Sequence, residues 1–213
     1  REEQRFKRKN PNSFSRGVLA VVTPWNFPLA IPCGMVASAL VAGNAVILKS
    51  AEQTPLIASI MVESFHRHGV PSDALIHLPG DGETVGDALV NHSKIAGVVF
   101  TGSKSVGLYL AHTLGKNIVK NPKNDMEYPA KVITEMGGKN AIIVTANAEL
   151  DETVAGILYS AFAHAGQKCS AASRVIVHES ILDSLKDRLK QAVNDLNVGK
   201  AWNYETSVNP IVS

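Results

Sequence analysis

Several features that mark particular classes of protein are scarce or missing in this chain of 213 residues. It has only two cysteines, so a disulfide framework is excluded, and no Cys-x-x-Cys pair or Cys/His cluster indicates a zinc site. This low cysteine usage favours a reducing, cytosolic compartment. A formal net charge of +2 is too small to indicate binding to nucleic acid. No uninterrupted apolar run is long enough to form a membrane span.

The beginning of the sequence lacks an initiator methionine and a secretory leader. The first residue is Arg1 rather than methionine, no secretory leader follows it, and the last residues turn apolar. We therefore expect a fragment of a longer protein. Basic residues among the first nine positions alternate with acidic and amide side chains, which predicts a solvated helix end rather than a binding patch.

Hydrophobic residues make up 45% of the chain, enough for a substantial core. Short, continuously apolar runs alternate with segments of helical period, which predicts an α/β fold with a Rossmann-like parallel sheet. The predicted strands are 17–23, 45–49, 76–79, 97–101, 132–135, 141–144 and 174–178. The predicted helices are 29–42, 55–68, 83–91, 103–114, 150–165 and 181–196.

The helix boundaries carry their own signals. Thr54 before Pro55 predicts a capped helix start, and Gly69 predicts the end of the same helix. The polar, proline-interrupted segment 120–129 predicts a surface loop. The character of the sequence changes after the Gly137-Gly138 pair, so we place a domain boundary between residues 136 and 137, with the beginning of a second α/β domain after it.

Cys169 is the candidate nucleophile. It lies in the sequence AGQKCSA, between an apolar helical segment and a predicted strand. Small neighbours would let a substrate and backbone N–H groups approach closely, and a nearby positive charge would favour the thiolate. The alternative is a buried cysteine that acts as a small hydrophobic residue. The other motifs favour the nucleophile.

Two polar residues at predicted strand ends are candidates to work with this thiol. Asn26 lies between the prolines of PWNFP, where Trp25 and Phe27 can pack it in place, so its amide is suited to donate to an oxyanion. Asparagine is also common in ordinary proline-rich turns. Glu135 precedes two glycines and is suited to act as a general base, although an exposed strand-end carboxylate is the simpler reading.

Further strand ends have the composition of a ligand-binding edge, because open α/β sheets bind ligands at the carboxyl ends of their strands. Lys49 and Glu52 can hydrogen-bond ribose hydroxyls, or form only a surface salt bridge with each other. Ser103 can begin a helix whose first N–H groups bind a pyrophosphate, or only cap that helix. The glycines of 80–86 miss the G-x-G-x-x-G spacing by one residue and predict a helix-start loop.

The motifs PWNFP, KSAE, FTGS, EMGGKN and GQKC resemble, in this order and spacing, the aldehyde dehydrogenase superfamily from about Gly17 to the end of the chain. The resemblance implies that Cys169 is the nucleophile, that Asn26 and the Cys169 backbone N–H hold the oxyanion, and that Glu135 activates the deacylating water. It implies an NAD-binding domain over 1–136, the beginning of the catalytic domain over 137–213, and no metal. The cofactor contacts implied are Lys49, Glu52, Ser103, Gly102, Phe100 and Trp25.

Further motifs, AEQTPLIA, GETVG and SAFxxAGQKCSA, resemble the 1-pyrroline-5-carboxylate dehydrogenase branch, including the dehydrogenase module of bifunctional proline utilization A proteins. This implies NAD-dependent oxidation of L-glutamate γ-semialdehyde to L-glutamate through a cysteine thiohemiacetal and thioester. Ser170 is suited to bond the substrate carboxylate, or serves packing alone. Lys49-Ser50 replaces the more usual Lys-Pro of the family.

Alternatives stay open within and outside this chemistry. A succinate-semialdehyde or broad-range aldehyde dehydrogenase would carry the same thiol site, and a non-catalytic nucleotide-binding module would use the fold alone. NAD is favoured over NADP because Glu52 would repel a 2′-phosphate. The resemblance implies a small-molecule aldehyde substrate, a homo-oligomeric parent with or without a fused proline dehydrogenase domain, and an inactive fragment. Nucleic acid is not an expected partner.

Overall fold

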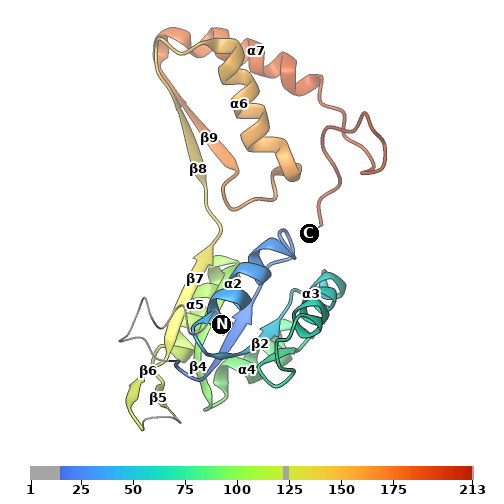
Figure 1. Cartoon of the computed structure of the whole chain (residues 1–213). Coiled ribbons are helices and arrows are strands. Elements are labelled where there is room, and N and C mark those ends of the chain that lie inside the picture. The colour runs from blue at the N-terminus through green and yellow to red at the C-terminus, as the bar shows by residue number, and fades with distance from the viewer. Residues whose placement is uncertain (1–14, 122–124, 213) are drawn as a thin grey trace. The chain divides into compact units, whose positions relative to one another are not determined.

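The computed structural model describes residues 15–121 and 125–212 (Figure 1). The chain divides into two compact units between Met136 and Gly137. The role of each unit, NAD binding for the first and catalysis for the second, stays a prediction. The helix end predicted within the first nine residues lies outside the described residues.

The first unit contains a five-stranded sheet in the order β3-β2-β1-β4-β7, in which every pair is parallel. The central strands β1 and β4 are rich in valine and are buried on both faces, so their sequences are continuously apolar. The order reverses between β1 and β4, because β2 and β3 extend the sheet on one side and β4 and β7 on the other. The strands span Val18–Val22 (β1), Ala45–Lys49 (β2), Leu75–His77 (β3), Ile95–Gly102 (β4) and Lys131–Met136 (β7).

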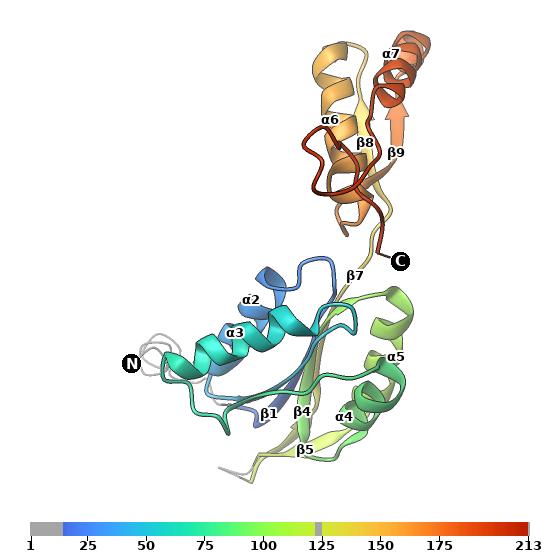
Figure 2. The ribbon, with the colours of Figure 1, turned by 90° about the vertical axis from the view of Figure 1, so that its right-hand side faces the viewer.

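Helices cover both faces of this sheet. Figure 2 shows α2 (Ala30–Val41) and α3 (Pro55–Arg67) on one face, and α4 (Asp87–Asn91) and α5 (Lys104–Leu114) on the other. The core between the layers includes Val21, which is fully buried. The predicted α/β fold with a parallel sheet is therefore confirmed.

The predicted helix boundaries are partly correct. Pro55 is the first residue of α3, and Gly69 follows the helix with φ +96°, a conformation that glycine adopts without strain. The predicted side-chain cap is wrong, because Thr54 makes no capping hydrogen bond. Its backbone, at φ −137° and ψ 44°, departs from the extended conformation that aims an N-cap side chain at the first turn.

The predicted surface loop at 120–129 is also partly wrong. Strands β5 (Ile118–Lys120) and β6 (Glu127–Pro129) pair in an antiparallel hairpin. Tertiary contacts organise this polar segment. Asn121 is almost fully buried and donates to the Ser15 carbonyl oxygen at 2.8 Å, while the Tyr128 hydroxyl donates to the carbonyl oxygen of Arg16.

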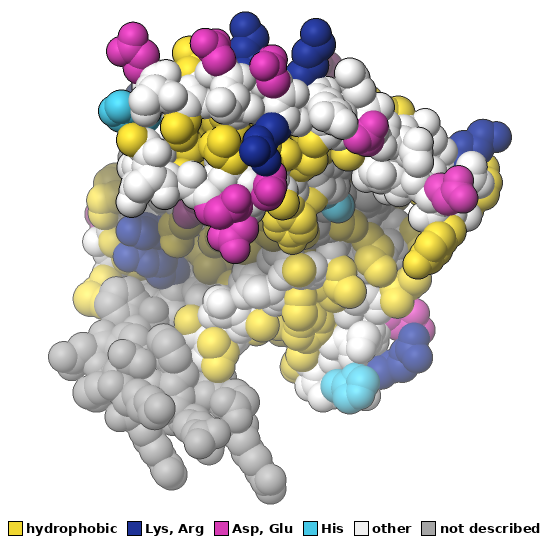
Figure 3. Space-filling model, turned by 90° about the horizontal axis from the view of Figure 1, so that it is seen from above, with side chains coloured by type: hydrophobic (Ala, Val, Ile, Leu, Met, Phe, Trp, Pro, Cys, Tyr) yellow, Lys and Arg dark blue, Asp and Glu magenta, His cyan; other side chains and the backbone are white. Residues whose placement is uncertain are grey.

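The second unit contains parallel strands β8 (Asn140–Val144) and β9 (Ala172–Val177) with helices α6 (Leu150–Phe162) and α7 (Leu182–Asn194). Alternate strand residues pack on Val154, Ile157 and Leu185 of the helices. The side chains between them face away, and Ile143 and Ile176, which pair across the strands, are 74% and 56% exposed. Figure 3, the view from above, shows charged side chains of both signs among the hydrophobic ones.

Candidate active site

The carboxyl ends of the strands in the first unit bring most of the predicted cofactor residues to one edge of the sheet. Val22, the last residue of β1, pairs with Lys49 on one side and with Phe100 on the other. On the next strand, Glu135 pairs with Thr101. The edge between β1 and β4 is the topological switch point, where open parallel sheets bind their ligands.

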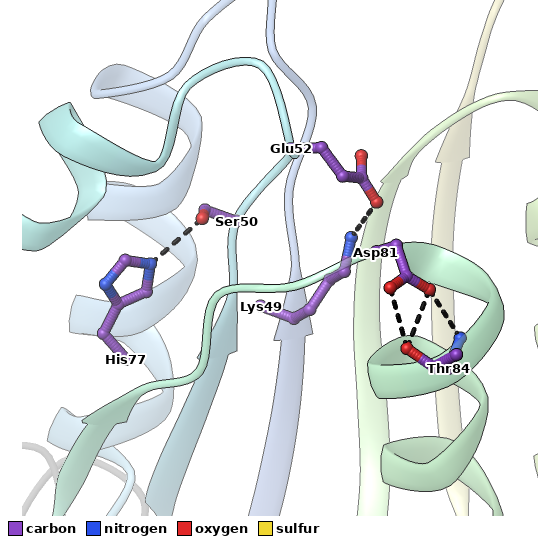
Figure 4. A network of polar contacts seen from close by, with 6 residues as sticks. All are labelled: Lys49, Ser50, Glu52, His77, Asp81 and Thr84. Atoms are coloured by element: carbon purple, nitrogen blue, oxygen red, sulfur yellow. Dashed lines mark hydrogen bonds and ion pairs between the residues drawn. The ribbon is translucent and has the colours of Figure 1, made fainter.

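Lys49 and Glu52 form an ion pair of 2.6 Å at the end of β2 (Figure 4). The Lys49 side chain is 5% exposed and that of Glu52 is 43% exposed, so the pair is half embedded rather than a surface salt bridge. Burial acts to raise the pKa of Glu52, but its hydrogen bonds and the Lys49 charge outweigh burial and hold that pKa below the usual value. A donor and an acceptor held side by side suit the vicinal hydroxyls of a ribose.

The glycine-rich segment after β3 packs close to this ion pair. A Cβ at Gly86 would lie 4.0 Å from Cε of Lys49. The Asp81 carboxylate caps the turn, accepting from the backbone N–H of Thr84 at 2.7 Å and from its hydroxyl at 2.8 Å, and these bonds lower the pKa of Asp81. The segment is a single π-helical turn, Gly82–Gly86, that leads into α4, so the predicted helix-start loop is confirmed.

Ser50 and His77 form a second contact at the same strand ends (Figure 4). The Ser50 hydroxyl lies 3.0 Å from Nε2 of His77, and Ser50 is 2% exposed. Burial lowers the pKa of His77 and so favours the neutral imidazole. This pair is not among the predicted site residues. Its one sequence signal is Ser50 at the position where the family usually has proline, which has no hydroxyl to offer.

Ser103 begins α5 at the end of β4. Its hydroxyl accepts from the backbone N–H of Val106 at 3.3 Å, so it caps the helix. The neighbouring Phe100 is buried, and its ring lies where a Cβ on Gly102 would be only 2.6 Å away. Phe100 therefore shapes this edge from within the core, while the exposed Ser103 and the first N–H groups of α5 are available to an anion.

The first unit also holds the other predicted catalytic residues. Asn26 and Trp25 are half-buried in the segment between β1 and α2. Glu135 is exposed near the end of β7. A Cβ on Gly107 of α5 would lie 2.7 Å from Sδ of the neighbouring Met136, so Met136 faces α5. Because successive side chains of a strand point to opposite faces, Glu135 points to the other side of the sheet, where β7 is open to solvent.

Cys169 belongs to the second unit, in the turn that precedes β9, and its thiol is free and exposed. The Asn140 side chain donates from Nδ2 to the Cys169 carbonyl oxygen at 2.7 Å and to that of Ala171 at 3.3 Å. Asn140 was not predicted; it ends the motif EMGGKN. Ser170 is exposed beside the thiol. Within residues 15–121 and 125–212, no cluster of three or more His, Cys, Asp or Glu side chains could hold a metal.

Comparison with known proteins identifies the family of the chain. Residues 4–213 match the aldehyde dehydrogenase family. The chain is 38% identical over 196 residues to 1-pyrroline-5-carboxylate dehydrogenase of Bacillus subtilis (strain 168), and the match covers 92% of this chain and 37% of that protein. It is 39% identical to the enzyme of the same name from Geobacillus thermodenitrificans (strain NG80-2), with the same shares covered.

Solved structures give the same result. Proline utilization A from Bdellovibrio bacteriovorus, inactivated by N-propargylglycine, matches with a TM-score of 0.86 and 44% identity over 93% of this chain and 20% of that one. 1-Pyrroline-5-carboxylate dehydrogenase from Thermus with bound NAD matches with a TM-score of 0.85 and 37% identity, covering 93% of this chain and 37% of that one.

The chain thus spans a little over a third of the length of the curated relatives. In the part of the chain that the structure describes, no helix is both long enough and apolar enough to cross a membrane. The predicted resemblance is confirmed: this chain belongs to the aldehyde dehydrogenase family.

Proposed function

We propose that the protein containing this chain oxidises L-glutamate γ-semialdehyde to L-glutamate with NAD⁺, as a step of proline catabolism. The observation that carries the proposal is Cys169, a free and exposed thiol in a turn of a chain 38% identical to a 1-pyrroline-5-carboxylate dehydrogenase. The same sequence has the amide of Asn26 and the carboxylate of Glu135 at its family motifs.

In the proposed mechanism, the Cys169 thiolate attacks the aldehyde carbon and forms a hemithioacetal. The new alkoxide accepts hydrogen bonds from the Asn26 amide and from the backbone N–H of Cys169. Loss of hydride from the hemithioacetal carbon leaves a thioester on the sulfur. Glu135 then takes a proton from water, which attacks the thioester and releases the carboxylate and the thiolate.

NAD⁺, when bound, would accept the hydride. The residues at the strand ends fit such a group. Lys49 and Glu52 offer a paired donor and acceptor for the adenosine ribose, and Ser103 with the first N–H groups of α5 offers donors for the pyrophosphate. Trp25 lies in the segment that follows β1, and Gly102 is the last residue of β4; these two strands flank the switch point. The buried Phe100 ring packs against Gly102.

The Lys49–Glu52 pair also supports the choice of NAD over NADP. The lowered pKa of Glu52 keeps its carboxylate charged at neutral pH, so a 2′-phosphate beside it would meet a negative charge. Comparing kcat/KM for the two cofactors tests this, and a preference for NADP would remove the argument from Glu52.

The substrate contact and the assembly are further parts of the proposal. Ser170, exposed beside the thiol, is suited to donate to the substrate carboxylate. We also propose that the full-length protein is a homo-oligomer. Several matched structures carry the name proline utilization A, one of them described as bifunctional, which supports a fused proline dehydrogenase domain in the full-length protein.

The test is NAD⁺ reduction by the full-length protein with L-glutamate γ-semialdehyde, succinate semialdehyde and propanal as separate substrates. We expect the highest kcat/KM with the first, and loss of nearly all turnover in Cys169→Ala with NAD⁺ affinity retained. Preference for another aldehyde would favour a succinate-semialdehyde or broad-range enzyme. Absence of turnover with all three would favour a nucleotide-binding module.

A further inference from the structure

The carbonyl group of Cys169 is anchored by a side chain far away in sequence. Asn140, at the beginning of β8, donates from Nδ2 to the Cys169 carbonyl oxygen at 2.7 Å. The same nitrogen lies 3.3 Å from the carbonyl oxygen of Ala171. Its two amide hydrogens therefore tie both ends of the three-residue turn that carries the thiol to the neighbouring strand.

An irregularity in the pairing of β8 and β9 lies next to the Asn140 contact. Asn140 pairs with Ala172, but the next residue, Ala141, pairs with Arg174, so Ser173 is an extra residue in β9. Such a bulge interrupts the regular ladder of backbone hydrogen bonds. The Asn140 amide supplies bonds to the turn just before the bulge.

Gly138 leaves the space in which this contact forms. A Cβ at position 138 would lie 2.9 Å from the Cys169 carbonyl oxygen and 3.0 Å from Nδ2 of Asn140. Real Cβ atoms essentially never approach other heavy atoms closer than 3.0 Å, so alanine at position 138 would displace the Cys169 carbonyl group from its present place. The glycine and the asparagine of the GGKN sequence thus serve one contact.

We propose that Asn140 is a positioning residue for the nucleophile: by holding the Cys169 carbonyl, its amide fixes the backbone from which the thiol and the oxyanion-binding N–H of Cys169 project. The proposal rests on the proposed function. Small errors of placement at a reacting atom cost up to about a hundredfold in rate, whereas binding of the remote parts of substrate and cofactor is unaffected.

The experiment compares Asn140→Ala, Gly138→Ala and the double variant in the full-length protein. Asn147→Ala is the matched control, because the Asn147 side chain accepts from the Thr145 hydroxyl at 2.9 Å and neither donates to nor accepts from the Cys169 turn among the described hydrogen bonds. The first measurement is amide hydrogen exchange of the peptide covering residues 163–172, which requires no activity. The second is kcat and KM for NAD⁺ and L-glutamate γ-semialdehyde.

We expect faster exchange of this peptide in Asn140→Ala and Gly138→Ala, and none of this change in Asn147→Ala. We expect kcat to fall about a hundredfold in each of the first two variants, with both KM values within about twofold of wild type. Because both substitutions act on the same Cys169 carbonyl group, the loss of kcat in the double variant should be smaller than the product of the two single losses.

Three results would overturn the proposal. Unchanged exchange in Asn140→Ala would show that the turn is held without the amide. Multiplied losses of kcat in the double variant would show that Gly138 and Asn140 act separately. A rise in KM at unchanged kcat would assign Asn140 to binding. Absence of turnover in the wild type would instead refute the proposed function, and the exchange data would still decide whether Asn140 anchors the turn.

Discussion

The ion pair of Lys49 and Glu52 allows its contribution to folding to be separated from its proposed role in cofactor binding. In Glu52→Gln, the nearly buried ammonium of Lys49 loses its charged partner and retains only an amide oxygen. Breaking a fully buried pair costs about 3–5 kcal/mol and an exposed pair is worth about 0.2–1 kcal/mol, so this half-embedded pair should lie between. We expect Glu52→Gln to lower the free energy of unfolding by about 1–2 kcal/mol.

Lys49→Met should behave differently. Methionine keeps an apolar stem in the space of the lysine stem, and the remaining carboxylate of Glu52, 43% exposed, is hydrated by solvent. We expect its free energy of unfolding to stay within about 1 kcal/mol of the unsubstituted protein. The KM for NAD⁺ should nevertheless rise by about tenfold or more, the effect expected from losing one hydrogen bond to a charged group, while the KM for the aldehyde stays unchanged.

Urea unfolding of the 213-residue chain in a Trp202→Phe background tests the stability values, because Trp25 is then the only tryptophan of these 213 residues and reports on the first unit. Both substitutions are made in that background, and steady-state kinetics of the full-length protein give the KM values. The reasoning is refuted if Lys49→Met destabilises the unit more than Glu52→Gln does. It is also refuted if Lys49→Met leaves the KM for NAD⁺ unchanged, since the pair would then serve folding alone.

Two other predictions concern the first unit. Burial lowers the pKa of His77 from its ordinary value of 6.5, so on acidification the unfolded chain binds a proton at a higher pH than the folded chain does, and the free energy of unfolding falls as pH drops below 6.5. Urea unfolding at pH 7.5 and 5.5 should therefore show a smaller loss of stability at the lower pH in His77→Gln than in the unsubstituted protein. An equal loss of stability in both would contradict this. Gly107→Ala places a Cβ 2.7 Å from Sδ of Met136 and should cost about 1–3 kcal/mol. Gly34→Ala, in α2 with open space around it, should gain about 0.5–1 kcal/mol, and calorimetry showing equal effects would contradict the packing argument.

The parallel sheet could be predicted because its signals are local. The apolar runs of β1 and β4 lie between buried faces, and Ser103 and Gly69 mark helix ends through their own backbone conformations. The positions of Lys49 and Phe100 at one edge follow from the parallel arrangement alone, since every such strand ends on the same side.

The missed features depend on pairing between distant segments. Ser50 meets His77 across β2 and β3, 27 residues apart, and Asn140 meets Cys169 29 residues away through the β8–β9 register. The β5–β6 hairpin is held by partners such as Ser15, which is 106 residues from Asn121. Thr54 shows the limit of a local rule, because the backbone at that position does not direct its hydroxyl to the helix.

The central claim, that Cys169 carries the acyl group and Glu135 directs water to it, is tested most directly by mass spectrometry of the full-length Glu135→Gln variant after mixing with NAD⁺ and L-glutamate γ-semialdehyde. We predict a glutamyl thioester on the peptide that contains Cys169, formed with one burst of NADH and persisting far longer than in the wild type. Cys33 serves as the internal control thiol. A burst without an adduct on Cys169, or an adduct on Cys33, would contradict the account.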